Sequence, residues 1–155
     1  MTNCIRPEFL DIINYSICQA VNEYLDEKAT EFFRRVGEYH LDEAVRRGLI
    51  RVERNHKPLD NLIEIARYLE STGYMEKIVI ERLSEGEALV EMYGVSVTSS
   101  SVRLLKDGKH PSHFMTNIML AALRRLGIQA ELRDVAFDEE ARKFKEHWKI
   151  LKTSK

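Results

Sequence analysis

GKHPSHFMTNIMLAAL, residues 108–123, is the stretch on which the interpretation of the fold depends. Two histidines three residues apart, His110 and His113, flank a proline and a serine, and an almost unbroken apolar segment follows them. The proline and the serine can begin a helix and Gly127 can end one, so we predict a helix over 112–126. This helix would be apolar over most of its circumference, which is typical of a helix buried on two sides.

Three further helices are expected before this stretch. Apolar side chains recur at helical spacing over 8–25 and 27–48, and a third helical pattern runs from Pro58 to Gly73. Within the second pattern, Gly37 costs a helix about 1 kcal/mol relative to alanine. We therefore expect Gly37 to permit the close approach of a neighbouring helix.

The apolar period changes from 3.6 to 2 after the third helix. Residues 75–83 and 87–97 alternate well enough to be strands, and SEGE between them is typical of a hairpin turn. Residues 128–137 alternate cleanly, as expected of a strand in an antiparallel sheet with one solvated face. The turn-rich segment 98–112 is left without an assignment.

A last helix is expected after Asp138, which would cap it. Apolar residues at spacings of four, three, four and three favour that helix: Phe137, Ala141, Phe144, Trp148 and Leu151. No linker or repeat divides the chain. We therefore predict a single α+β domain over 1–155, with N-terminal helices and a small antiparallel sheet of three or four strands packed with helices.

Composition excludes several classes of function. The formal net charge of −1 offers no large attraction for nucleic acid or acidic membranes, and the basic cluster at 46–57 lacks interleaved aromatic residues for base stacking. Two cysteines do not encode a disulfide framework. Glu8 and Asp11 interrupt the first apolar segment, so no secretory signal is expected, and no stretch is long enough to span a membrane. A cytoplasmic protein is the expectation.

Metal chemistry has a weak basis in the sequence. His110 and His113 supply two imidazoles, whereas a catalytic zinc site usually needs three protein ligands and a structural site four. The remaining histidines and both cysteines belong to separate predicted elements. No phosphate-binding glycine motif and no nucleophile elbow is present. A metal is therefore not favoured, and no catalytic residue is proposed.

Two features favour a pocket, each with a plainer explanation. His40 lies four residues after Val36, on the helix face expected to enter the core, where it is either a hydrogen-bonded core histidine or part of a pocket. Met115 and Met119 lie on the broad apolar face of the 112–126 helix, and flexible methionines suit a surface that adapts to apolar guests. Solid core packing explains the same pattern.

Three segments together resemble a known family: FFRRVGEYHLDEAV (32–45), IVIERLSEGEALVEMYGVSV (78–97) and HPSHFMTNIMLAALRRLGIQAEL (110–132). Their order resembles the vinyl-reductase-type domain, which is related to core subunits of the transport protein particle, a vesicle-tethering complex. The resemblance implies a fold that dimerises and encloses an apolar tunnel or pocket for hydrophobic molecules or lipids. This chain has Ser112 or His113 where such domains often carry a cysteine, so cysteine-dependent chemistry is not carried across.

The leading hypothesis is a homodimeric, non-catalytic binding or sensor domain for a small hydrophobic or lipid-like molecule, with no other cofactor indicated. Its expected ligand contacts are His40, His113, Phe114, Met115, Asn117, Ile118 and Met119. One alternative is a metal-dependent enzyme that uses His110 and His113. Another is an assembly subunit in which the stripe from Phe137 to Trp148 packs on a second subunit or another protein, although packing on its own sheet is the favoured explanation of the stripe.

Overall fold

The order of helices and strands confirms the α+β class. The structure, a computed structural model, describes residues 4–153. The elements in chain order are α1 (Pro7–Leu25), the 3-10 helix η1 (Asp26–Lys28), α2 (Ala29–Arg46), α3 (Pro58–Ser71), β1 (Lys77–Ser84), β2 (Glu87–Tyr93), α4 (Thr98–Lys106), α5 (Phe114–Arg125), β3 (Ile128–Asp138) and β4 (Lys143–Thr153). None of these described helices is long and apolar enough to cross a membrane.

The four strands form one antiparallel sheet in the order β1-β2-β4-β3. β4 lies between β2 and β3, and its side chains alternate between the two faces of the sheet. Phe144, Glu146 and Trp148 are buried on the inner face, whereas Lys143 and Lys145 lie on the partly exposed outer face. The predicted antiparallel sheet with one solvated face is therefore confirmed.

The helix predicted after Asp138 is wrong. The Ala141 N–H donates to Asp138 Oδ1 (2.9 Å), so Asp138 caps the turn between β3 and β4 and not a helix. Phe144 and Trp148 lie four residues apart, a spacing that fits one face of a helix and one face of a strand equally well. Hydrogen bonding to two neighbouring strands decides in favour of the strand. Phe144 and Trp148 are buried, so these two members of the stripe pack in the core, whereas Phe137 is only partly buried and Ala141 is exposed.

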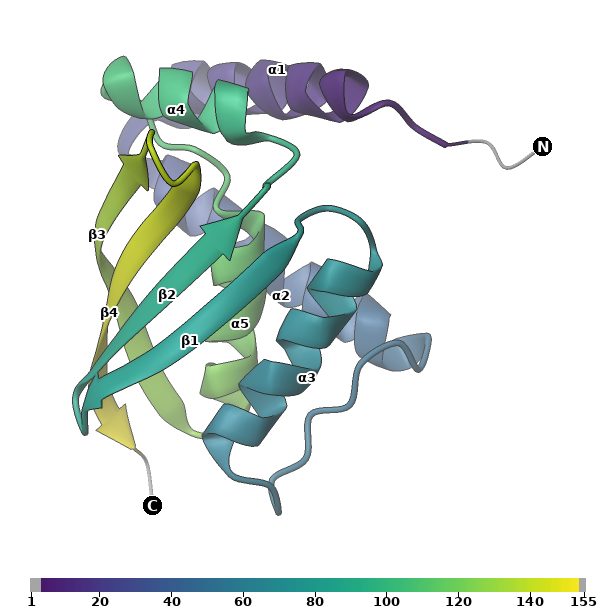
Figure 1. Ribbon diagram of the computed structural model, residues 1–155, viewed down its shortest axis with the longest axis vertical. Coiled ribbons are helices and arrows are strands. Elements are labelled where there is room, and N and C mark those ends of the chain that lie inside the picture. Colours follow the sequence, from purple (N-terminus) through teal and green to yellow (C-terminus); the bar gives the residue numbers. More distant parts are fainter. Residues whose placement is uncertain (1–3, 154–155) are drawn as a thin grey trace.

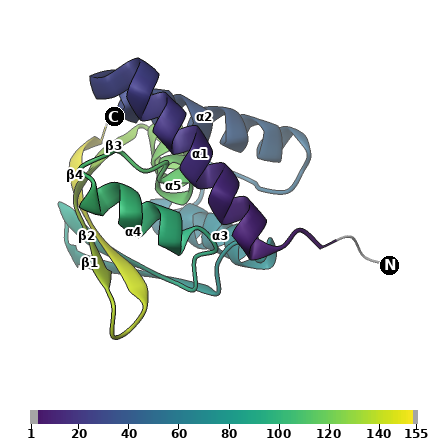
Figure 2. The same cartoon turned by 90° about the horizontal axis from the view of Figure 1, so that it is seen from above.

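The segment that the sequence left unassigned contains α4. Three consecutive serines in its first turn lower its intrinsic helix propensity, which hid the pattern. Tertiary packing stabilises α4 instead, because the helix lies alongside α1 and its Leu104 is completely buried. Figure 2 shows the two helices side by side across one end of the molecule. Leu104 packs there in a small core cluster with Cys18, Val21 and Phe33.

Helix α5 occupies the centre of the molecule, between the sheet and α2 (Figure 1). Eight of its twelve residues are buried, including Ile118, Met119 and Leu123. The prediction of a helix buried on two sides is confirmed, although α5 begins at Phe114, two residues later than expected. A helix in this position must be apolar on one face for the sheet and on the opposite face for its helical neighbours.

The close helix approach predicted at Gly37 is also confirmed. Gly37 of α2 lies directly against Asn117 of α5. A Cβ added at Gly37 would stand 2.5 Å from the Cβ of Asn117 and 2.6 Å from its carbonyl carbon. Real Cβ atoms essentially never come so close, so only glycine fits this crossing.

Replacement of Gly37 by alanine is expected to destabilise the protein. Alanine has the higher helix propensity by about 1 kcal/mol, but the clash is with Cβ and backbone atoms of α5, and overpacking of this kind costs about 1–3 kcal/mol. Urea unfolding should therefore give a lower midpoint for Gly37→Ala. Gly86→Ala is the matched control, since an added Cβ there meets nothing closer than 3.9 Å. Equal midpoints for the two variants would contradict the close contact.

Candidate functional site

The segment that leads into α5 is held in place by side chains of α1. The Asn22 side chain makes a reciprocal pair of hydrogen bonds with the backbone of His110, donating to its carbonyl (2.8 Å) and accepting from its N–H (2.9 Å). Two residues along, the Ser112 hydroxyl donates to Asn14 Oδ1 (2.8 Å), and Asn14 Nδ2 donates to Ser100 Oγ (2.8 Å). Buried polar groups in this region are therefore paired, as stable cores require.

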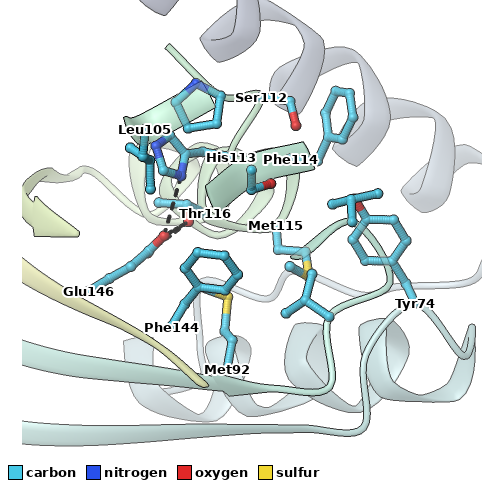
Figure 3. Close-up of a pocket in the computed structure, with 14 residues that line it drawn as sticks. Tyr74, Met92, Leu105, Ser112, His113, Phe114, Met115, Thr116, Phe144 and Glu146 are labelled. Atoms are coloured by element: carbon cyan, nitrogen blue, oxygen red, sulfur yellow. Dashed lines mark hydrogen bonds and ion pairs between the residues drawn. The ribbon is translucent and has the colours of Figure 1, made fainter. Parts of the chain in front are cut away.

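His113 forms the junction between this segment and α5. Its backbone is left-handed, with φ at 46° and ψ at 40°, a conformation that is uncommon for a residue with a side chain. The conformation turns the chain into α5 and brings His113 Nδ1 to 3.6 Å from Oε1 of Glu146 on β4 (Figure 3). His113 is half-buried, and Glu146 is almost completely inaccessible to solvent.

Glu146 is a carboxylate in the core, with a side chain only 1% exposed. The Thr116 hydroxyl lies 2.6 and 2.7 Å from its two oxygens, and the indole N–H of Trp148 donates to Oε2 (2.9 Å). Burying an ionised group is costly unless hydrogen bonds replace its hydration. The Thr116 hydroxyl and the Trp148 indole N–H supply hydrogen bonds that replace part of this hydration.

A small cavity lies beside this cluster. Figure 3 shows it enclosed by side chains that include Tyr74, Met92, His113, Met115 and Phe144. Its volume is about 30 Å³, the space that one water molecule occupies in the liquid. The cavity next to His113 therefore has no room for an organic guest.

A much larger hollow lies on the opposite side of Phe114 and Met115, and we call it the first groove. Its volume is about 660 Å³. It is bounded by the start of α1, by α2, by the second half of α3 and by the first half of α5. Its apolar lining consists of Ile5, Pro7, Leu10, Val36, Leu69, Phe114, Met115 and Ile118, and its polar lining of Cys4, His40, Tyr68, Thr72, Gly73, Tyr74 and Ser96.

Four of the residues expected to contact a ligand line the first groove: His40, Phe114, Met115 and Ile118. The other three lie elsewhere. His113 borders the small cavity. Asn117 packs against Gly37 and donates through Nδ2 to the Ser112 carbonyl (3.0 Å), whereas Met119 is fully buried and lines neither space.

The expectation that His40 enters the core is wrong. The residue lies at an exposed edge of the first groove, where its Nε2 is 2.9 Å from the hydroxyl oxygen of Tyr68. Val36, which shares this face of α2, also lines the groove. The part of the ring that faces protein is desolvated, and this lowers the pKa of the His40 imidazole below its ordinary value.

The two histidines proposed as metal ligands have separate environments. His110 is exposed and its Nδ1 lies 3.3 Å from Thr30 Oγ1, whereas His113 Nδ1 faces Glu146. Within residues 4–153, no three or more His, Cys, Asp or Glu side chains are grouped so that they could hold a metal ion. The structure therefore adds no third ligand to the pair.

A second groove, which the sequence did not indicate, lies between the first half of α3 and the inner face of the sheet. Its volume is about 560 Å³. Its lining consists of Lys57, Pro58, Leu59, Leu62, Ile80, Arg82, Glu85, Ala88, Leu123, Ile128, Trp148 and Ile150. The pairing of β4 with β2 creates this space, so the incorrect helix prediction concealed it.

Comparisons with solved structures show which folds this chain resembles. The structure of a trafficking protein particle complex subunit 3 from Naegleria fowleri, covalently bound to palmitic acid, matches 96% of this chain and 97% of its own, with a TM-score of 0.66 and 12% identity. A structure from a study of heme distortion in the H-NOX family matches 99% of this chain and 77% of its own, with a TM-score of 0.55 and 10% identity. A T. Tengcongensis H-NOX mutant matches 99% and 78%, also with a TM-score of 0.55 and 10% identity.

These similarities concern the fold. No protein-family model matches the sequence, and no curated protein matches it as a relative. The expected resemblance to subunits of the transport protein particle is confirmed in three dimensions, and the H-NOX fold is a second similarity that the sequence did not suggest. At 9–12% identity, the residues of these proteins do not assign roles to residues of this chain.

Removal of the Thr116 hydroxyl should destabilise the protein through Glu146. Thr116→Val keeps the shape of the side chain but leaves a buried carboxylate without one of its donors, at a cost of about 1–3 kcal/mol. Thr116→Ser retains the hydroxyl, so its free energy of unfolding should fall by less than that of Thr116→Val. The free energy of unfolding in urea separates the two variants. Equal losses would show that the hydrogen bonds to Glu146 contribute little.

Proposed function

We propose that this chain is a non-catalytic domain that binds a small hydrophobic or lipid-like molecule in the first groove. The observation that carries the proposal is a hollow of about 660 Å³ with a mainly apolar lining and a few polar groups at its edge. Ligand pockets in proteins are commonly about 300–1,000 Å³ and have this composition. A domain that only binds needs no assembled nucleophile, base or metal.

Phe114, Met115 and Ile118 provide the floor of the proposed site. All three lie on the first half of α5, so the same helix that fills the core also presents apolar surface to the groove. Met115 separates the groove from the small cavity beside Glu146, since it lines both. Its unbranched thioether side chain can change rotamer to fit guests of different shape.

The proteins of similar fold support this class of ligand. The Naegleria protein is bound to palmitic acid, and the H-NOX proteins are studied for their heme, so this arrangement of helices and sheet accommodates large, mainly apolar groups in both cases. For this chain we propose a guest held without a covalent bond. His40 would then contact the guest at the edge of the groove. Three other residues would not touch the guest but would support α5 from behind the groove: His113, Asn117 and Met119.

Filling the first groove should abolish binding. Val36→Trp places an indole in the hollow from a half-buried position on α2. We expect retention of radiolabelled dodecan-1-ol during gel filtration to fall by about tenfold or more, since each 1.4 kcal/mol of lost binding energy is tenfold in affinity. Leu59→Trp is the matched control, because it fills the second groove from an exposed position on α3.

Trp148 provides an independent reporter of the location. It is the single tryptophan of the chain and lines the second groove, not the first. Bromine quenches indole fluorescence at short range, so 12-bromododecan-1-ol bound in the first groove should leave the emission of the unmodified protein nearly unchanged. Strong quenching of Trp148, together with loss of alcohol binding in Leu59→Trp, would show that the alcohol binds in the second groove. Absence of any retained alcohol would refute the proposed function.

We also propose that α1 is the contact surface of a homodimer. Large apolar side chains are exposed along one side of this helix: Phe9, Ile12, Ile13, Ile17 and Tyr24. Contiguous apolar surface of this kind marks protein or membrane contacts. Acidic residues outnumber basic ones in residues 6–28, which disfavours an anionic membrane and favours protein. A second copy is the partner that the family resemblance implies.

Sedimentation velocity tests the dimer. Ile12→Glu places a charge in the middle of the exposed face of α1, and we expect a dimer of the unmodified chain to become a monomer, because an unpaired buried charge costs several kcal/mol. Leu83→Glu introduces the same charge at an exposed apolar position on β1 and should leave the dimer intact. A monomer at all concentrations of the unmodified chain would contradict the proposal.

A further inference from the structure

The first groove has an uncharged lining. Among the described residues that form it there is no Asp, Glu, Lys or Arg. The second groove differs, because Lys57, Arg82 and Glu85 stand at its edge. A charged ligand group moved from water into an apolar site needs a partner to offset the lost hydration. The first groove provides no ionised partner, whereas the second provides two cations.

Two hydroxyl groups in the lining of the first groove already donate hydrogen bonds to the backbone. The Thr72 hydroxyl donates to the Leu69 carbonyl (2.7 Å), and the Ser96 hydroxyl donates to the Tyr74 carbonyl (2.9 Å). Their hydroxyl protons are therefore occupied. The polar side chains that remain for a ligand are the His40–Tyr68 pair, the hydroxyl of Tyr74 and the thiol of Cys4, which is only a weak hydrogen-bond donor.

The His40–Tyr68 pair retains one proton to donate, whichever tautomer the ring adopts. If the Tyr68 hydroxyl donates to Nε2, the N–H at Nδ1 of His40 is left. If Nε2 carries the proton and donates to Tyr68, the phenolic O–H is left. Among residues 4–153, neither side chain has another hydrogen-bond partner. The pair is thus a donor at the edge of an apolar space.

The environment of Tyr74 disfavours negative charge. Burial is the main cause that raises the pKa of the Tyr74 phenol well above its usual range, and Cys18 and Asp11 add to the effect. The phenol therefore stays neutral and can donate a hydrogen bond. An anion placed beside it would meet the same desolvation and the same repulsion from Asp11.

We propose that the first groove selects an uncharged apolar molecule whose hydroxyl or carbonyl oxygen accepts a hydrogen bond from the His40–Tyr68 pair or from Tyr74. This inference rests on the proposed function and names the chemistry of its ligand. It distinguishes a long-chain alcohol, aldehyde or ketone from a fatty-acid anion of the same length. The contrast between the two grooves predicts that anionic amphiphiles, if they bind, prefer the second.

The test compares three twelve-carbon probes at pH 7.5: dodecan-1-ol, dodecanoate and dodecane. In competition against radiolabelled dodecan-1-ol, the unlabelled alcohol should bind with about tenfold higher affinity than dodecanoate, because the anion loses its hydration without gaining a counter-charge. The double variant His40→Phe/Tyr68→Phe removes both donors of the pair, and it should weaken the alcohol by about two- to tenfold, the effect of one hydrogen bond, and leave dodecane unchanged. Tyr39→Phe, at an exposed tyrosine of α2 outside the groove, is the control.

The possible outcomes separate this inference from the proposed function. If dodecanoate binds as tightly as the alcohol and Val36→Trp removes both, the groove is the site but its selectivity is not as inferred. If the double variant His40→Phe/Tyr68→Phe and the variant Tyr74→Phe both leave the preference for the alcohol intact, neither proposed donor acts and the inference fails. If Leu59→Trp removes binding of dodecan-1-ol and Val36→Trp does not, the second groove is the site and both proposals fall. If no probe binds, the proposed function itself is refuted.

Discussion

The contact between Gly37 and Asn117 is the constraint on which the rest of the structure depends. It lets α2 approach α5 so closely that no side chain fits between them at that point. Helix α5 can then lie between α2 and the sheet, with apolar residues on both sides. The same crossing directs Val36 of α2 and Ile118 of α5 toward a shared space, so the first groove is a consequence of how closely the helices meet.

Polar contacts then determine where α5 begins. Asn14 and Asn22 of α1 hold the chain at Ser112 and His110, far away in sequence, and leave His113 in a left-handed conformation at the helix start. Glu146 and Thr116 secure the first turn of α5 to the sheet. These bonds specify one arrangement of the segment, since a shift of one residue would leave buried groups unpaired.

The arrangement produces two apolar hollows of similar size and different electrostatic character. α3 separates them, with its second half against the first groove and its first half against the second. Proteins that share the fold hold palmitic acid or heme, which indicates how adaptable the arrangement is. Because such a fold accommodates different guests, the fold alone does not identify a guest for this chain.

The sequence by itself determined the helices over α1, α2, α3 and α5, the β1–β2 hairpin, β3 and the tight approach at Gly37, because each depends on local period or on the absence of a side chain. It also indicated four residues that line the first groove. Tertiary structure alone decided that residues 143–153 form a strand, since the spacing of Phe144 and Trp148 fits either period and only neighbouring strands select one. It likewise decided the burial of Glu146, the exposure of His40 and the existence of the second groove, because each depends on residues distant in the chain.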